Sequence, residues 1–250
     1  VIDIAGNSIE RKIEITNIDK QSPTIELSQA VEDWTNKAYD IEIIVNDGEG
    51  SGIDFITYPD NKTGTSTTYI VSENGDYTFK VVDKAGNETE KTITISNIDM
   101  DNPTSKFALN PDIIINQDVE ITLTATDISG IAKIELLSDA NIKEDSFIYT
   151  DGDNVAKVTV LANGTYVFDI TDNSGNKVTE SVEVKNIDKL DPTVELTQNI
   201  VTPTNKNIEI MIEAVDNIAI DTIKWDKGMK TVEDFIGNEN TIDNNTSFIV

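Results

Sequence analysis

One segment of this chain occurs three times, and the repeat restricts the folds open to it. Residues 77–104 read YTFKVVDKAGNETEKTITISNIDMDNPT, and residues 166–193 read YVFDITDNSGNKVTESVEVKNIDKLDPT. Residues 1–24, VIDIAGNSIERKIEITNIDKQSPT, carry the second half of the same pattern. A repeat longer than about 50 residues is large enough to enclose its own core. We therefore expect whole domains joined in a row and not a solenoid of small units.

The spacing of acidic residues shows how regular the repeat is. In each copy an aspartate precedes a proline by 20 residues, in the pairs Asp3–Pro23, Asp83–Pro103 and Asp172–Pro192. A second aspartate follows each proline by 24 residues, at Asp47, Asp127 and Asp216. The remaining interval varies, from 36 residues between 47 and 83 to 45 residues between 127 and 172. This predicts variable loops in that interval and fixed strand pairing elsewhere.

Between these positions, apolar and polar residues alternate with the period of a half-buried strand. In the copy at 20–100 the pattern predicts strands at 24–27, 40–46, 53–58, 67–71, 76–82 and 88–96. A further strand is predicted at Lys12–Thr16, and Asn74-Gly75 and Asn163-Gly164 predict two-residue hairpin turns. Short strands with frequent turns and no helical period predict Greek-key β-sandwiches.

The copies divide the chain into four parts. Residues 1–19 correspond to the C-terminal strands of a truncated preceding domain, and residues 20–100 and 101–189 to two full copies. Residues 190–250 correspond to an incomplete domain, because their sequence stops where the copy at 20–100 reaches Val71. We therefore expect the chain to be a piece of a longer array.

The composition excludes several classes of function. Lys and Arg number 19 against 46 Asp and Glu, and the net charge of −27 repels nucleic acid and anionic lipid. No apolar run is long enough to insert into a membrane. His and Cys are absent, which removes the commonest general base, transition-metal ligands and disulfides. An enzyme is therefore not expected, and paired carboxylates for glycoside hydrolysis lack a cleft-forming insertion.

The repeated motifs resemble a known family. The glycine turn followed by YxFxVxDxAGN, the Asn-Ile-Asp linker and the Pro-Thr after it are similar to the bacterial immunoglobulin-like repeats of Gram-positive surface proteins, including adhesins. The resemblance covers nearly the whole chain. It implies an all-β fold of tandem immunoglobulin-like Greek-key β-sandwich domains in a linear array. It also implies an extracellular, cell-surface or cell-wall location, with neighbouring immunoglobulin-like domains of the same longer chain as partners.

The topology of such a sandwich brings acidic residues together. The incoming linker, the loop after the second strand and the loop after the sixth strand share one pole. Three or more oxygen ligands at that pole suit a hard cation such as calcium. The candidate ligands are Asp19, Asp47 and Asp83 at the first pole, Asp99, Asp101, Asp127 and Asp172 at the second, and Asp188, Asp191 and Asp216 at the third.

A purely structural interpretation of these residues stays open. Asp83 has the strand parity of the inward-facing Tyr77, Phe79 and Val81, so its carboxylate turns inward where the strand ends. There it could accept hydrogen bonds from the amides of the Ala85-Gly86-Asn87 turn. The two tryptophans also have structural interpretations. Trp225 aligns with core positions, and Trp34 is expected to cover one end of a sandwich.

These features predict a non-catalytic stalk or spacer segment of a bacterial extracellular surface protein, with joints stiffened by calcium. One alternative is a self-assembling surface fibre or surface layer, whose homo-oligomer contacts would involve residues 1–19 and 240–250. Another is an accessory module of a secreted enzyme, in which loops 59–66 or 139–154 bind a host or cell-wall glycan or protein.

Overall fold

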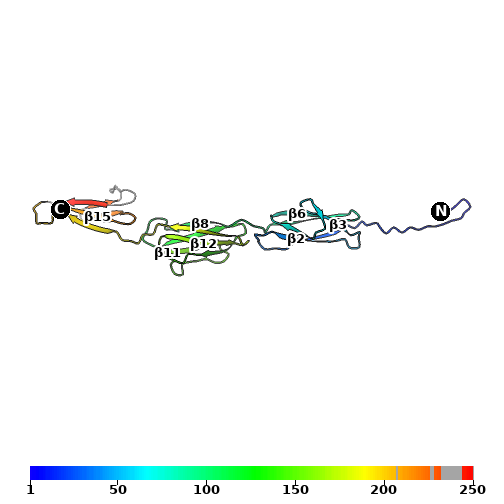
Figure 1. The fold of residues 1–250 in the computed structure, drawn as a ribbon, viewed down its shortest axis with the longest axis horizontal. Coiled ribbons are helices and arrows are strands. Elements are labelled where there is room, and N and C mark those ends of the chain that lie inside the picture. The colour runs from blue at the N-terminus through cyan, green and yellow to red at the C-terminus, as the bar shows by residue number, and fades with distance from the viewer. Residues whose placement is uncertain (207, 226–227, 232–243, 250) are drawn as a thin grey trace.

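The chain forms strands and no helices in the part that the structure describes. The structure is a computed structural model that describes residues 1–206, 208–225, 228–231 and 244–249. Neighbouring strands in its sheets pair antiparallel, and no helix within these ranges is long and apolar enough to span a membrane. The all-β prediction is therefore confirmed. Figure 1 shows three groups of strands that follow one another along the long axis, after an extended N-terminal segment.

The first group is a two-sheet sandwich. One sheet has the strand order β1-β2-β5 and the other β4-β3-β6-β7. The strands are β1 Thr24–Gln29, β2 Tyr39–Asn46, β3 Ile53–Thr57, β4 Thr63–Gly64, β5 Thr68–Val71, β6 Gly75–Asp83 and β7 Glu88–Ile95.

Alternating residues of both sheets enclose one core. Ile41 and Ile43 of β2 are almost completely buried, while Glu42 between them faces solvent. Phe79 and Val81 of β6 enter the same core from the opposite sheet. Two sheets that bury their facing side chains against each other form a β-sandwich.

The second group repeats this arrangement. Its sheets have the orders β8-β9-β11 and β10-β12-β13. Ile121 and Leu123 of β9 face Phe168 and Ile170 of β12 in its core. The strands are β8 Thr104–Asn110, β9 Val119–Thr126, β10 Ile131–Leu136, β11 Val155–Val160, β12 Gly164–Asp172 and β13 Lys177–Val184.

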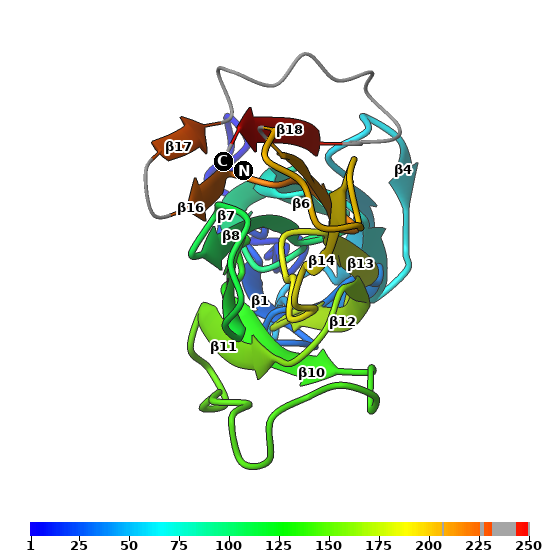
Figure 2. The same ribbon diagram turned by 90° about the vertical axis from the view of Figure 1, so that its left-hand side faces the viewer.

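The longer interval of the second sandwich, residues 137–154, is ordered against a sheet edge. Isolated antiparallel bridges join Ile142 to Val160 and Ile148 to Lys157. Tyr149 from the same segment packs against the core. The segment therefore covers the edge of β11, which would otherwise present unpaired backbone groups. Viewed along the molecule, it projects to one side (Figure 2).

The third group is smaller in the described residues. One sheet has the order β14-β15-β18, with β14 Thr193–Gln198, β15 Glu209–Val215 and β18 Asn244–Ile249. The other pairs β16 Thr222–Trp225 with β17 Gly228–Thr231. Its described core consists of Ile212, Ala214, Ile220 and Ile223. The prediction that the Trp225 side chain packs in the core falls outside the described residues.

Both hairpin predictions are wrong. β5 pairs with β2, whereas β6 pairs with β3 and β7, so the chain crosses between sheets at Asn74-Gly75. The chain crosses in the same way at Asn163-Gly164, between β11 and β12. Neither asparagine has the positive φ that a type I′ hairpin turn requires. Their side chains are instead used to hold the linkers, as described below.

The strand predicted at Lys12–Thr16 is not formed. Ile13 and Ile15 carry the predicted alternation, but they are 87% and 63% exposed. A strand is stable only when neighbouring strands satisfy its backbone groups and cover its apolar face. In the described residues, this segment has no such neighbour.

Candidate metal centres at the sandwich junctions

The motif at the end of β6 and of β12 is an aspartate–asparagine turn. Asp83 accepts hydrogen bonds from the backbone N and the side-chain Nδ2 of Asn87, both at 2.8 Å. Asp172 accepts the same pair from Asn176, again at 2.8 Å. In the N-terminal segment, Asp3 makes the equivalent turn within residues 3–7. The turn interpretation of the DxxxN motif therefore describes a contact present in all three copies.

The same asparagine also holds the incoming linker. Asn176 Nδ2 donates to the backbone carbonyl oxygens of Asp99 and Asp101, at 3.0 and 2.7 Å. Asn87 Nδ2 makes the weaker counterpart with the carbonyl of Gln21, at 3.2 Å. One side chain thus joins the end of β6 or β12 to the chain that enters the same sandwich.

The outgoing linker is held by two other asparagines. In the Asn97-Ile98-Asp99 linker, Asn97 Nδ2 donates to the carbonyl oxygens of Val31 and Asp33, at 3.0 and 2.8 Å. The side chain of Asn74 then pairs with both backbone groups of Ile98, with Nδ2 to O at 2.7 Å and N to Oδ1 at 2.9 Å. An amide side chain carries both a donor and an acceptor, so Asn74 pairs with Ile98 as a neighbouring strand would.

The second linker, residues 186–188, repeats these contacts with one difference. Asn163 pairs with both backbone groups of Ile187 at 2.8 Å, and Asn186 Nδ2 donates to the carbonyls of Pro111 and Ile113. However, Asn186 Oδ1 is buried with no hydrogen-bond partner. At the first linker the equivalent oxygen accepts from the hydroxyl of Tyr39 at 2.7 Å. The first residue of β9 is instead Val119, which has no donor to offer.

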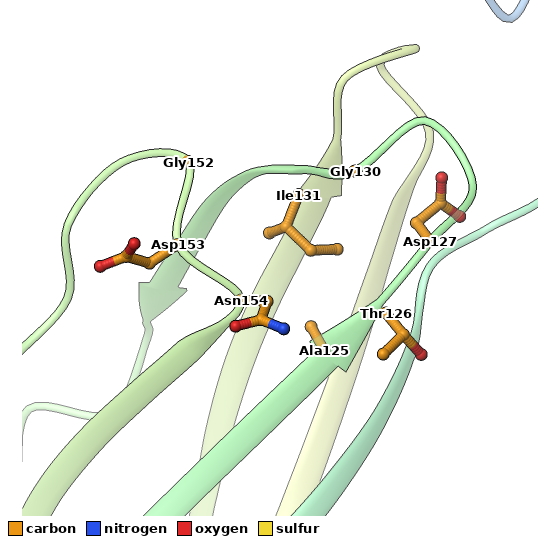
Figure 3. A pocket seen from close by; sticks show the side chains of 8 residues that line it. All are labelled: Ala125, Thr126, Asp127, Gly130, Ile131, Gly152, Asp153 and Asn154. Atoms are coloured by element: carbon orange, nitrogen blue, oxygen red, sulfur yellow. The ribbon is translucent and has the colours of Figure 1, made fainter.

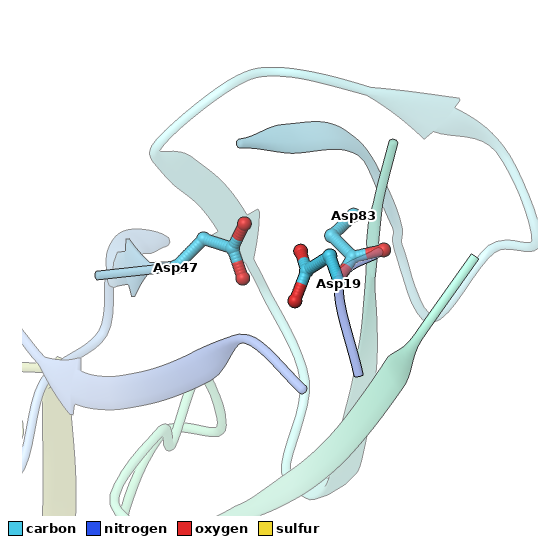
Figure 4. A group of neighbouring side chains, drawn as sticks. All are labelled: Asp19, Asp47 and Asp83. Atoms are coloured by element: carbon cyan, nitrogen blue, oxygen red, sulfur yellow. The ribbon is translucent and has the colours of Figure 1, made fainter. Parts of the chain in front are cut away.

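Three predicted ligands converge at the first pole. Asp19, Asp47 and Asp83 each offer one carboxylate oxygen, and these three oxygens lie within 4.8 Å of one another. Figure 4 shows the carboxylates of Asp47 and Asp19 turned toward each other, with Asp83 beside them. Asp19 Oδ2 accepts from the Ser51 amide at 2.6 Å, and Asp47 Oδ2 accepts from the Gly52 amide at 2.6 Å. Hydrogen bonds from the amides of Gln21 and Ser51 lower the pKa of Asp19.

Asp99, Asp127 and Asp172 converge equally closely at the second pole. Burial raises the pKa of Asp127, and the neighbouring Asp99 carboxylate raises it further. For Asp99, burial opposes ionisation, but hydrogen bonds from the Asp101 amide and from the Ser174 hydroxyl lower its pKa. The two carboxylates therefore differ in their tendency to hold a proton.

Four predicted ligands lie outside both clusters. Asp101 contributes its backbone to the linker, while its side chain is exposed. Asp191 is exposed, and Asp188 and Asp216 are half-buried near the third group. Asp188 Oδ1 accepts from Asn217 Nδ2 at 3.3 Å. The strand ends that supply Asp83 and Asp172 at the other poles, those of β6 and β12, have no counterpart among the described residues here.

A shallow hollow of about 350 Å³ lies beside the second cluster, between the loop after β9 and the end of the 137–154 segment. Figure 3 shows Asp127 and Asp153 on opposite sides of it. Its lining mixes polar and apolar side chains without an aromatic ring, and consists of Ala125, Thr126, Asp127, Gly130, Ile131, Gly152, Asp153 and Asn154. Such a lining offers no platform on which a sugar ring could stack. Trp34, which is expected to cover one end of a sandwich, is half-buried.

The linker-holding asparagines and the serines at the second pole were missed from sequence. Asn74, Asn97, Asn163 and Asn186 recur at fixed positions in the repeat, and this recurrence was their only signal. We interpreted the Asn-Gly pairs through backbone turn preference, which says nothing about side-chain partners. The roles of Ser129 and Ser174 depend on the folded geometry of two loops, which carries no sequence signal of its own.

The comparisons with known proteins identify no family. No protein-family model matches the chain, and no curated protein matches it. Among solved structures, it aligns with the Bacteroides ovatus mixed-linkage glucan utilization locus SGBP-B in complex with a mixed-linkage heptasaccharide. The sequence identity is 14% and the TM-score 0.24, over 92% of this chain and 61% of that one. The chain thus spans less than two thirds of that protein, and a similarity at this level supports no inference about function.

Proposed function

We propose that this chain is a stiff spacer within an extracellular bacterial surface protein, built of tandem immunoglobulin-like domains. The strand orders β1-β2-β5 and β4-β3-β6-β7 support the immunoglobulin-like assignment, because that fold separates its strands between two sheets in this way. The acidic surface, with a net charge of −27, suits a solvated rod that does not associate with nucleic acid or anionic lipid.

The observation that carries the proposal is that all three residues of the first Asn-Ile-Asp linker, Asn97, Ile98 and Asp99, are held. Asn97 and Ile98 are bonded to the preceding sandwich. Asp99 bonds to both sides, because its amide donates to the Thr35 carbonyl and its Oδ2 accepts from Ser174 of the following sandwich. None of these three residues is a free hinge, so bending at them requires breaking hydrogen bonds that are partly or fully buried.

Calcium at the poles is the second part of the proposal. Oxygens on opposite sides of one calcium ion lie about 4.8 Å apart, so three carboxylate oxygens within 4.8 Å of one another fit a single coordination shell. One ligand in each cluster, Asp19 or Asp99, belongs to the linker, and the other two belong to the sandwich that follows. A bound cation would therefore cross-link the linker to the sandwich and further restrict the joint.

Small-angle X-ray scattering tests both parts. We expect a rod-like profile whose maximum dimension is the sum of the folded units, and a broader range of lengths when calcium is removed with a chelator. The same profile with and without chelator would contradict calcium joints. A profile typical of a flexible chain of beads, with calcium present, would contradict the stiff spacer itself.

A further inference from the structure

The two acidic clusters occupy equivalent positions, but their carboxylates differ in how well the protein satisfies them. The difference originates in the loop after the second strand of each sandwich. That loop reads Asp47-Gly-Glu-Gly-Ser51-Gly in the first sandwich and Asp127-Ile-Ser129-Gly in the second. The serine therefore follows the aspartate by four residues in one loop and by two in the other.

In the short loop, the serine satisfies its own aspartate. The backbone N and the hydroxyl of Ser129 both donate to Asp127 Oδ1, at 2.8 and 2.7 Å. Ser174 adds a second hydroxyl, which donates to Asp99 Oδ2 at 3.0 Å. Two protein hydroxyl groups are thus directed at the carboxylates of the second cluster.

In the long loop, the serine serves Asp19 and not Asp47. The amide and the side chain of Ser51 both hydrogen-bond to Asp19, and the hydroxyl oxygen accepts from the Ala85 amide at 3.0 Å. Residue 85 corresponds to Ser174 of the second sandwich, so the counterpart of that hydroxyl is absent from the first cluster. Asp47 keeps one partner, the amide of Gly52 at its Oδ2.

Asp47 Oδ1 is consequently buried with no hydrogen-bond partner, although the residue is only 8% exposed. The backbone of Gly50 packs against this carboxylate so closely that a Cβ there would lie 2.5 Å from Asp47 Oδ2. A buried carboxylate oxygen without a partner costs free energy unless a ligand satisfies it. Asp47 faces Asp19 and Asp83, so the ligand best suited to this oxygen is a cation held by all three residues (Figure 4).

We propose that the two junctions are inequivalent: the cluster of Asp19, Asp47 and Asp83 is a calcium site that requires its cation, whereas Ser129 and Ser174 satisfy the cluster of Asp99, Asp127 and Asp172 without one. This inference rests on the calcium part of the proposed function. It predicts a rod in which one joint depends on external calcium and the next is closed by the protein alone. Hard oxygen ligands and the absence of His and Cys favour calcium over transition metals.

The test is a calcium titration by calorimetry of the chelator-treated 250-residue chain and two matched variants, Asp47→Asn and Asp127→Asn. Both substitutions keep an acceptor oxygen for the loop amides, so the loop turns are retained. We expect one tight site in the unsubstituted chain, weakened more than about tenfold by Asp47→Asn and unchanged by Asp127→Asn. Asp19→Asn, which changes a linker residue and not a core-facing one, should weaken the same site. Circular dichroism confirms that each variant is folded.

A gain of function provides the converse test. The double substitution Ser129→Ala and Ser174→Ala removes both hydroxyl donors from the second cluster and should create a second tight site. An equal loss of calcium affinity in Asp47→Asn and Asp127→Asn, or two equally tight sites in the unsubstituted chain, would overturn the inequivalence of the two junctions. Either result would still agree with calcium binding at the joints. Absence of calcium binding in the unsubstituted chain would overturn both the inference and the calcium part of the proposed function.

Discussion

At the residue scale, side-chain amides do most of the joining in this molecule. Asn87 and Asn176 bond incoming linkers, while Asn74 and Asn163 pair with outgoing ones as strands would. An amide can donate and accept at once without carrying charge. An amide can therefore hold a linker at a junction that already contains several carboxylates. Another acidic side chain there would repel these carboxylates, and a lysine would be attracted to them.

Asn176 allows this role to be tested directly. Asn176→Ala removes three hydrogen bonds from a buried group and leaves the carbonyls of Asp99 and Asp101 without that donor. We expect the second sandwich to lose about 1–3 kcal/mol of unfolding free energy, measured by urea denaturation. Ser181→Ala, at an exposed position on β13, serves as the control. Equal stability of the two variants would show that Asn176 has no structural role.

The contacts of Asp169 predict that the stability of the protein depends on pH. The ammonium of Lys177 and the hydroxyl of Thr179 lower its pKa, at 2.5 and 2.6 Å from the carboxylate. Its folded pKa therefore lies below the unfolded value of about 3.9. The resulting stability is present above that unfolded value and is lost as pH falls through the folded one. Asp169→Asn should lower the free energy of unfolding at pH 7. Between pH 5 and pH 2, the free energy of unfolding of this variant should decline less than that of the unsubstituted chain. Parallel curves for variant and parent would contradict this.

At the element scale, the sequence predicted the strands better than their connections. Tyr39–Asn46 and Val119–Thr126 alternate so regularly that only one face can be buried, and the structure confirms both strands. Lys12–Thr16 alternates as well but forms no strand. An alternating pattern shows only which face of a strand would be buried, and a strand also needs a neighbouring strand with which to pair. Topology also brought six of the ten predicted acids into two clusters, since the loops that carry them share a pole. Of the serines that distinguish those clusters, Ser129 depends on a loop that is two residues shorter than its counterpart, and Ser174 replaces Ala85 in a loop of equal length.

The turn after β12 yields an element-scale prediction. Gly175 has φ +92°, as Gly86 does at +90° and Gly6 at +88°. A side chain in this left-handed region costs about 1–2 kcal/mol. Gly175→Ala should destabilise the second sandwich by that amount in a thermal or urea melt. Gly164→Ala is the matched control, since Gly164 has no positive φ and a Cβ there would meet nothing closer than 3.9 Å. The prediction fails if the control loses as much stability as the variant.

At the scale of the whole molecule, the repeated sandwiches determine length and the linkers determine how neighbouring sandwiches are oriented. Each sandwich has its own hydrophobic core, so the length of the molecule increases with the number of sandwiches. In the first linker, Asn97, Ile98 and Asp99 are each hydrogen-bonded to a sandwich, and Asp99 is bonded to both, so the linker couples the orientation of one sandwich to that of the next. The account's central claim is therefore that the geometry of this joint is fixed.

The most direct test is a distance distribution across that joint. The chain contains no cysteine, so Lys91→Cys on β7 and Ser181→Cys on β13 introduce two unique labelling sites at exposed positions. Pulsed electron paramagnetic resonance measures the distance between spin labels at these sites. In calcium-containing buffer, the distance distribution should show one narrow peak. The same pair with Asn97→Ala and Asn176→Ala added should give a broader peak. A broad distribution in the chain with its native linker would contradict the claim that the joint is held.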